Sequence, residues 1–262
     1  MSYDLIVTAV RDRADLLDRT LRSLLASLDA KPSRILVHED VRPSVECPAE
    51  PTTRALLDAI ADDFAVPVVL FERNPGGGLG RAVLRLLEES STEFVLYTQE
   101  DFDALRAIPV AACLDLMAAH QINHVRFNKR KTMKVKGADR PPGERFTKIE
   151  QAFGEQTLCV SDNWYFQTSL WRRELALDGF RAVAERNGPG MIDRCEMKFQ
   201  RWLHEGLGRG IGCTDSTGAE RRGEVVKTFI WGPTLEPAFI RHTGHDRRSQ
   251  GWPDPEKRNR DS

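Results

Sequence analysis

The densest group of chemically active side chains in the sequence lies in "YTQEDFDAL", residues 97–105. Glu100, Asp101 and Asp103 follow directly on the apolar run that begins at Phe94. Mg²⁺ and Mn²⁺ prefer carboxylate oxygens as ligands, and Mg²⁺ commonly shares the rest of its coordination shell with phosphate. Acids at the end of a strand are also common as solvated end residues. The cluster taken alone leaves both interpretations open.

A second candidate is the glycine-rich run "NPGGGLGR", residues 74–81. Its glycines, Gly77 among them, lead into a predicted helix whose first turn carries Arg81, and a helix N-terminus can face a phosphate, a ribose or a base. The run is not a P-loop, because no Lys-Ser or Lys-Thr follows it. It is a poor dinucleotide fingerprint, because it follows the third predicted strand and not the first. A flexible turn is the alternative.

The elements that must position these groups alternate along the chain. Apolar runs predict strands, and helically spaced leucines predict amphipathic helices. The alternation predicts an α/β fold with a parallel sheet flanked by helices. The expected strands span residues 4–10, 33–40, 66–74 and 93–101, and the expected helices span residues 14–28, 52–64 and 78–91.

Ligands of such sheets collect at the carboxyl ends of the strands. The two candidates above therefore share one predicted edge with the residues that follow the first two strands. A nucleotide diphosphate bridged by a divalent cation suits this combination of acids, glycines and arginine. The candidate nucleotide-binding residues are Thr8, Ala9, Arg11, Glu39, Asp40, Asn74, Gly77, Arg81 and Glu100.

Composition limits the class of protein. The 262 residues include 40% hydrophobic and 29% charged residues, which is ordinary for a globular enzyme, and the net charge of −1 does not bear on a nucleic-acid partner. No apolar stretch reaches the length of a membrane helix, and the N-terminus has no signal-peptide pattern, so we expect a cytoplasmic protein. Five scattered cysteines without a CxxC pair indicate free thiols and disfavour a zinc site.

Four motifs in this order resemble the GT-A glycosyltransferases, family 2 in particular. The motifs are "VTAVRDRADLLDRTLRSLLASL", "LVHED", "NPGGGLGRAV" and "YTQEDF". The resemblance covers residues 3–105 well and the remainder loosely. It implies a mostly parallel, twisted GT-A sheet with a C-terminal acceptor-side α+β extension. Residues 1–105 are then the nucleotide-sugar half and residues 106–262 the acceptor-binding and catalytic half of one compact domain.

The resemblance also implies a reaction and its cofactor. A sugar passes from a nucleotide-diphosphate donor, with a UDP-sugar favoured, to a hydroxyl acceptor, and Mn²⁺ or Mg²⁺ holds the diphosphate. "QED" departs from a strict DxD, so the metal ligand could be Glu100, Asp101 or Asp103, and Asp101 is favoured. The loop after the first strand lacks the usual proline and tyrosine, which leaves the nucleobase open.

In the second half, the resemblance suggests further site residues. "SDNWYFQTSLWRREL" (161–175) stands where such enzymes line the acceptor pocket, with Asp162, Trp164 and Tyr165 as candidates, or it is a core strand whose aromatics only pack. Asp193 and Glu196 are the possible catalytic bases. In "AFIRHTGHDRRSQGW" (238–252), His242 is assigned to the metal, and the possible phosphate ligands are His245, Arg247 and Arg248. A solvated basic tail is the alternative for this last stretch.

The segment 126–148 carries nine lysines and arginines against two acids. It could follow a polyanion such as DNA, close over the diphosphate, or be a solvated loop. A hydroxymethylated base in DNA is one possible acceptor by analogy with phage glucosyltransferases. Two other functions are considered: a nucleotidyltransferase that makes sugar nucleotides, since "GGGLGR" fits its "GGxGxR" loop, and a non-catalytic nucleotide- or nucleic-acid-binding module.

Overall fold

A computed structural model represents the protein. It describes residues 1–40, 52–73, 78–129, 150–161, 164–187, 195–206, 220–221, 224–225, 227–233 and 236–243. None of the helices in these ranges is both long enough and apolar enough to cross a membrane.

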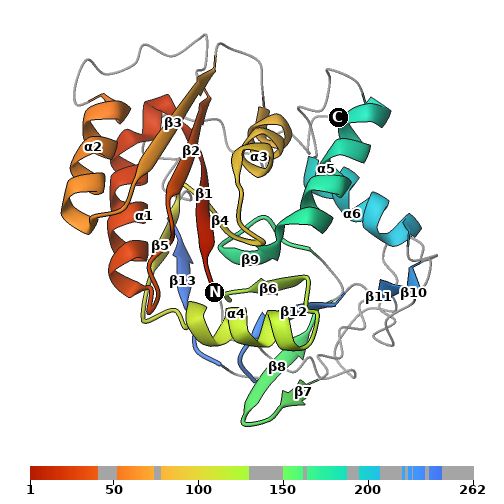
Figure 1. Cartoon of the computed structure of the whole chain (residues 1–262). Coiled ribbons are helices and arrows are strands. Elements are labelled where there is room, and N and C mark those ends of the chain that lie inside the picture. Colours follow the sequence, from red (N-terminus) through yellow and green to blue (C-terminus); the bar gives the residue numbers. More distant parts are fainter. Residues whose placement is uncertain are drawn as a thin grey trace, which may run out of the picture.

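The largest sheet of the described residues has nine strands in the order β3-β2-β1-β4-β9-β6-β12-β8-β7 (Figure 1). Its first four strands pair in parallel throughout, which confirms the sheet predicted for the N-terminal half. The bounds of the nine strands are β1 Tyr3–Val10, β2 Ile35–Asp40, β3 Val68–Arg73, β4 Phe94–Gln99, β6 His124–Arg126, β7 Glu150–Phe153, β8 Gln156–Val160, β9 Ser169–Arg172 and β12 Thr228–Trp231.

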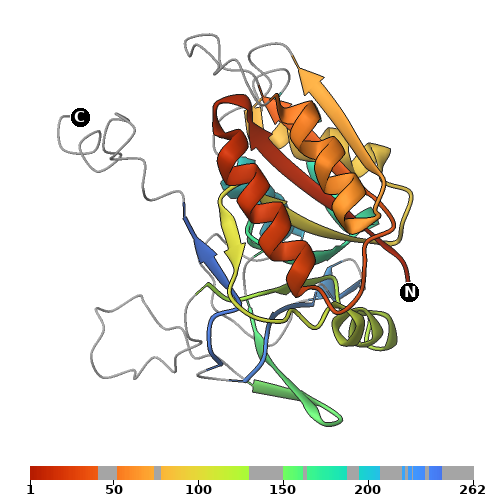
Figure 2. The same ribbon diagram turned by 90° about the vertical axis from the view of Figure 1, so that its left-hand side faces the viewer.

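The second half of the chain continues the same sheet with mixed pairing. β9 runs antiparallel to both β4 and β6, so β4 and β6 point in the same direction. A separate two-stranded ribbon pairs β5 (Phe102–Ala104) with β13 (Ile240–His242) in antiparallel fashion (Figure 2). A further small pair joins β10 (Glu220–Arg221) and β11 (Glu224–Val225). The sheet thus brings segments from both halves to one edge.

Helices cover both faces of the sheet. The helices α1, α2 and α4 cover one face, and α3, α5 and α6 cover the other (Figure 1). Thr52 caps α2 as predicted, because its hydroxyl accepts the Ala55 N–H at 3.3 Å. The helices span α1 Ala14–Ser27, α2 Thr53–Phe64, α3 Gly78–Glu89, α4 Val110–Ala119, α5 Arg173–Asn187 and α6 Cys195–Gly206, and the 3₁₀ turn Arg11–Arg13 precedes α1.

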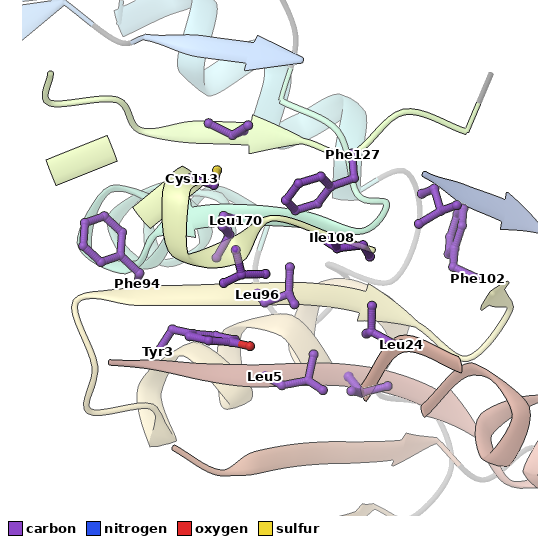
Figure 3. Packing of buried hydrophobic residues seen from close by; sticks show 14 of the residues in the cluster. Tyr3, Leu5, Leu24, Phe94, Leu96, Phe102, Ile108, Cys113, Phe127 and Leu170 are labelled. Carbon is purple, nitrogen blue, oxygen red and sulfur yellow. The ribbon is translucent and has the colours of Figure 1, made fainter. Parts of the chain in front are cut away.

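Alternation along the strands supplies two cores. In β1, Leu5 and Val7 belong to the cluster beneath α1, α2 and α4, part of which Figure 3 shows, whereas Ile6 faces the cluster beneath α3, α5 and α6. The second cluster is rich in aromatic rings, with Trp171 stacked on Tyr97 at a centroid distance of 4.5 Å. These packed faces fix the strand ends from which the polar side chains project.

The helices α5 and α6 approach each other at Gly179. A Cβ atom there would lie 2.4 Å from a ring carbon of Phe199 and 2.6 Å from one of Trp202. Both rings belong to the packed aromatic core and cannot move aside freely. The absence of a side chain at Gly179 therefore sets how closely α6 docks on α5.

We predict that Gly179→Ala destabilises the protein. Overpacking costs about 1–3 kcal/mol, whereas alanine is favoured over glycine in a helix by about 1 kcal/mol, so the net loss should reach about 2 kcal/mol. Denaturant unfolding measures it. Glu185→Ala on the exposed side of α5 is the control and should change stability by less than about 0.5 kcal/mol. A stabilised Gly179→Ala variant would contradict the packing described here.

Candidate active site

One edge of the sheet collects the polar side chains. The carboxyl ends of β2, β1 and β4 lie next to one another there, and the start of β9 and the end of β6 continue the same edge. β9 enters the sheet at Ser169, which pairs with Tyr97 near the end of β4 on one side and with Arg126 at the end of β6 on the other. The end of β4 thus meets the segment 164–168 from the second half of the chain.

The acids at the tip of β4 already have cationic partners. Glu100 and Asp101 are buried, and the buried Arg13 guanidinium lies 2.8 Å from Glu100 Oε1 and 3.7 Å from Asp101 Oδ2. Burial raises the pKa of Glu100 to about 6, and the neighbouring Asp101 adds to the rise, while Arg13 opposes it. The three groups carry a net charge of −1 when both acids are ionised.

His242 approaches the same acids from the C-terminal part of the chain. Its Nε2 lies 3.2 Å from Asp101 Oδ2, and Thr243 donates its backbone N–H to the Asp101 carbonyl at 2.8 Å. The ribbon of β5 and β13 carries His242 to this position. Asp101 and His242, both predicted as metal ligands, are therefore in direct contact.

The chemistry of this pair fits a divalent cation. Two donor atoms held about 2.1 Å from one ion at right angles lie about 3 Å apart, close to the separation found here. Within the described residues, however, no group of three or more His, Cys, Asp or Glu side chains is arranged to hold a metal ion. An ion on Asp101 and His242 needs further ligands, which a diphosphate and water can supply.

Asp103 does not belong to this group. In the β5–β13 ribbon it pairs with Arg241, whereas the neighbouring pair joins Phe102 and His242 and faces the other way. The carboxylate of Asp103 lies 3.1 Å from both Arg19 Nε and Arg241 Nη2. The prediction of Asp103 as a metal ligand is corrected: the structure pairs it with two arginines.

Three other predicted nucleotide ligands are occupied inside the protein. Glu39 is buried and accepts hydrogen bonds from Arg11 Nε, at 2.8 Å, and from the Thr53 hydroxyl. The Thr8 hydroxyl lies 3.2 Å from the Tyr97 hydroxyl in the interior, and Ala9 is buried in the core. These side chains make their contacts inside the protein, and the assignment of the three residues as nucleotide ligands stays a prediction.

The remaining donor-side candidates lie at the edge itself. Arg11 is half-buried. Its guanidinium lies 2.8 Å from Glu39 Oε2 and 3.7 Å from Glu72 Oε2. Asp40 ends β2 and is half-buried, and Arg81 lies in the first turn of α3 as predicted. Arg11 and Asp40 lie at the ends of β1 and β2, and Arg81 lies at the start of α3. Their role as nucleotide ligands stays a prediction.

Of the predicted acceptor residues, Trp164 is corrected. Its ring is fully buried among His124, Trp171 and Phe199, so it packs in the core and has no exposed face for a sugar. Tyr165 is half-buried, and the Arg126 guanidinium lies 3.8 Å from the centre of its ring. Of the two rings, only that of Tyr165 remains accessible to a ligand.

Glu196 lies in the first turn of α6, is exposed, and accepts the Phe166 N–H at 3.4 Å. The Phe166 carbonyl in turn accepts a hydrogen bond from Gln99 Nε2 at 2.9 Å. One residue thus bridges the candidate base to the end of β4. Desolvation of its carboxyl group by the surrounding protein raises the pKa of Glu196, while the Phe166 N–H, Lys129 and Arg126 oppose the rise.

Some predictions lie outside the described residues: Asn74, Gly77, Asp162, Asp193, His245, Arg247 and Arg248, and most of the segment 126–148. Sequence reasoning also missed Arg13 as a partner of the acids and Arg126 as a member of this edge. Arg13 lies between the expected strand 4–10 and the expected helix 14–28, where no local pattern indicates a partner. Arg126 is one of nine basic residues in the segment 126–148, and composition does not set it apart from the others.

Comparisons with known proteins support the fold. No protein-family model matches the sequence, and no curated protein gives a significant match. Solved structures do match. S. aureus TarS superposes over 93% of this chain and 37% of its own, with a TM-score of 0.53 and 15% identity. TarS 1–349 in complex with UDP superposes over 91% of this chain and 60% of its own, with a TM-score of 0.52 and 12% identity.

The chain has a GT-A-like glycosyltransferase fold. The complex of TarS 1–349 with UDP-GlcNAc matches as well, at a TM-score of 0.50 and 12% identity over 97% of this chain and 63% of that one. The GT-A-like chain therefore spans between about a third and two thirds of the length of these structures. At such identities the likeness concerns the fold.

We predict that Arg13→Met destabilises the protein by about 3–5 kcal/mol, because it leaves Glu100 and Asp101 buried without their guanidinium partner. Adding Glu100→Gln should recover part of the loss, since it removes one of the two charges. Denaturant unfolding at neutral pH checks both variants. Arg22→Met, which breaks exposed pairs with Asp18 and Asp63, is the control and should cost less than about 1 kcal/mol. Equal effects at Arg13 and Arg22 would contradict the role given to Arg13.

Proposed function

We propose that the protein is a glycosyltransferase that moves a sugar from a nucleotide-diphosphate donor, a UDP-sugar first of all, to a hydroxyl acceptor. The observation that carries the proposal is the order of groups along one sheet edge. Arg11 and Asp40 lie on one side of the Asp101–His242 pair. Glu196 lies on the other side, where the backbone of Phe166 links it by hydrogen bonds to Gln99. A donor and an acceptor that meet at the tip of β4 fit this order.

In this proposal residues 1–105 bind the nucleotide. The half-buried Arg11 and Asp40 and the first turn of α3 with Arg81 face the nucleoside and its phosphates. TarS 1–349, which has the same fold, has been crystallised with UDP and with UDP-GlcNAc, so UDP is the first nucleotide to test.

Asp101 and His242 would hold Mn²⁺ or Mg²⁺. Such an ion, when bound, neutralises the charge that develops on a departing diphosphate. The Arg13 guanidinium lies 3.7 Å from Asp101 Oδ2 in the core, and the β5–β13 ribbon carries His242 to the same carboxylate. These residues therefore position the diphosphate end of the donor.

Glu196 is the base in this proposal. An ionised carboxylate near the end of β4 can accept the proton of an acceptor hydroxyl as that oxygen attacks the sugar. Glu196 is exposed and can reach a ligand, while its hydrogen bond from the Phe166 N–H orients the carboxylate. Asp193 stays a prediction, since it lies outside the described residues.

The nucleotidyltransferase alternative requires the glycine-rich loop to follow the first strand. Here the run follows the third strand of the chain, β3, and leads into α3. Release of pyrophosphate from a nucleoside triphosphate and a sugar phosphate would favour that alternative. DNA as acceptor also stays a prediction, because most of the basic segment lies outside the described residues.

We predict that UDP with Mn²⁺ raises the melting temperature of the protein and that either one alone raises it less, because a ligand selective for the folded state stabilises it by mass action. A panel of nucleoside diphosphates with and without Mn²⁺ measures the shifts. Asp101→Asn should abolish the dependence on Mn²⁺. Arg241→Met, which alters the outer ion pair with Asp103, is the control and should keep it. No shift with any nucleotide would contradict the proposal.

We predict that Glu196→Gln lowers kcat/KM for sugar transfer by about 10²–10⁴-fold, the usual contribution of a general base. The raised pKa of Glu196 adds a pH signature. Below that pKa the carboxyl group is protonated and cannot accept a proton, so activity should fall as the pH decreases. The fall should occur at a higher pH than for a base with the ordinary glutamate pKa of about 4.3. This acid limb should be absent in Glu196→Gln. A variant of wild-type rate with an unchanged profile would exclude Glu196 as the base.

A further inference from the structure

Arg126 is a cation at the acceptor side of the edge that the proposed reaction leaves without a role. It ends β6, two strands from β4, and strands lie about 4.8 Å apart, so its backbone is about 10 Å from that of β4. Arg126 and His124 lie on the same face of the sheet by alternation. Trp164 contacts His124 and Tyr165 contacts Arg126 on this face. It is the face of the sheet that the aromatic core beneath α5 and α6 covers.

Neutral groups hold this guanidinium in place. It lies over the ring of Tyr165 at 3.8 Å, and the buried Gln167 amide, turned with its oxygen inward, accepts from Arg126 Nε at 2.9 Å and Nη1 at 3.0 Å. A guanidinium has five N–H donors in a planar fork, so these contacts fix its orientation and leave donor capacity for another partner.

Within the described residues, no ion pair joins a carboxylate to Arg126. Arg11, Arg13, Arg19 and Arg241, by contrast, each have a carboxylate oxygen within 4.0 Å. Burial lowers the pKa of its guanidinium, while Tyr165 and then Glu196 oppose that change. A half-buried charge that contacts only neutral groups has lost part of its solvation free energy. The attraction of an anionic ligand can offset that loss.

We propose that Arg126 binds an anionic group, a phosphate or a carboxylate, of the acceptor. The inference rests on the proposed function, since it takes the side of Glu196 as the acceptor side. It narrows the acceptor to a molecule that carries an anionic group within a few bonds of the hydroxyl that reacts. Arg126 is then a specificity-determining residue, and Tyr165 and Gln167 are positioning residues that aim its fork.

The test compares small alcohols that differ in charge. With UDP and Mn²⁺ present, the wild-type protein is titrated calorimetrically with glycerol 3-phosphate, glycerate and glycerol. We expect at least one anionic probe to bind about 10-fold or more tightly than glycerol, as charge-assisted hydrogen bonds provide. Arg126→Met should abolish the preference and leave the affinity for UDP unchanged. Arg126→Lys should keep part of the preference for the anionic probe, because lysine retains the positive charge but lacks the planar fork of donors.

A matched control is Arg172→Met. Arg172 also lies over an aromatic ring, that of Phe94, but it pairs with Glu93 at the opposite edge of the sheet. This variant should keep the preference for the anionic probe. If Arg126→Met does not fold, Arg126→Lys carries the test: an unchanged preference there overturns the inference.

Other outcomes show whether the anion that Arg126 binds belongs to the donor diphosphate or to the acceptor. If Arg126→Met weakens UDP and the anionic probe alike, Arg126 serves the donor diphosphate and the inference is wrong. Equal binding of charged and uncharged probes by the wild-type protein also overturns it. Failure of the proposed function has a different signature: the wild-type protein then binds no nucleotide, whatever the small probes do.

Discussion

The structure depends most on two neighbouring carboxylates, Glu100 and Asp101, buried side by side at the tip of β4. Water solvates such charges far better than a protein interior does, so their burial is tolerable only with cationic partners in contact. Arg13 fills that role from the turn before α1, and His242 approaches from the far end of the described chain. The first and last parts of the fold are thus tied to one point of the sheet. The remaining net charge of the two acids and Arg13 is the physical reason to expect a cation there.

Around this point the sheet edge divides into two environments. Toward β1 and β2, the charged groups pair with one another, as Arg11 does with Glu39, and leave half-buried side chains at the strand ends. Toward β9 and β6, Tyr165 and Gln167 hold Arg126 without a close acid, and Glu196 lies beyond Phe166. The helix α6 fixes this second side, since Glu196 and, one turn later, Gln200 both bond to the backbone of residues 164–166. Close packing at Gly179 in turn fixes α6.

The N-terminal half of the fold could be predicted because its signals are local. Leucine spacing in 14–28, the Thr52 cap and the apolar runs each concern neighbouring residues, and the parallel sheet follows from their alternation. The meeting of Asp101 and His242 came from the resemblance to a family and not from any local pattern. What failed concerned partners distant in sequence. Asp103 meets Arg241 across 138 residues, and Trp164 is enclosed by rings from three elements, and no local pattern reports such contacts.

A crystal structure of the protein with UDP and Mn²⁺ tests the central claim most directly. The account predicts the ion against Asp101 and His242, the diphosphate on that ion, and the nucleoside along the ends of β1 and β2, with the space beside Glu196 and Arg126 left open. A nucleotide bound at another face, or an Asp101–His242 contact that stays closed beside a bound UDP, would contradict it.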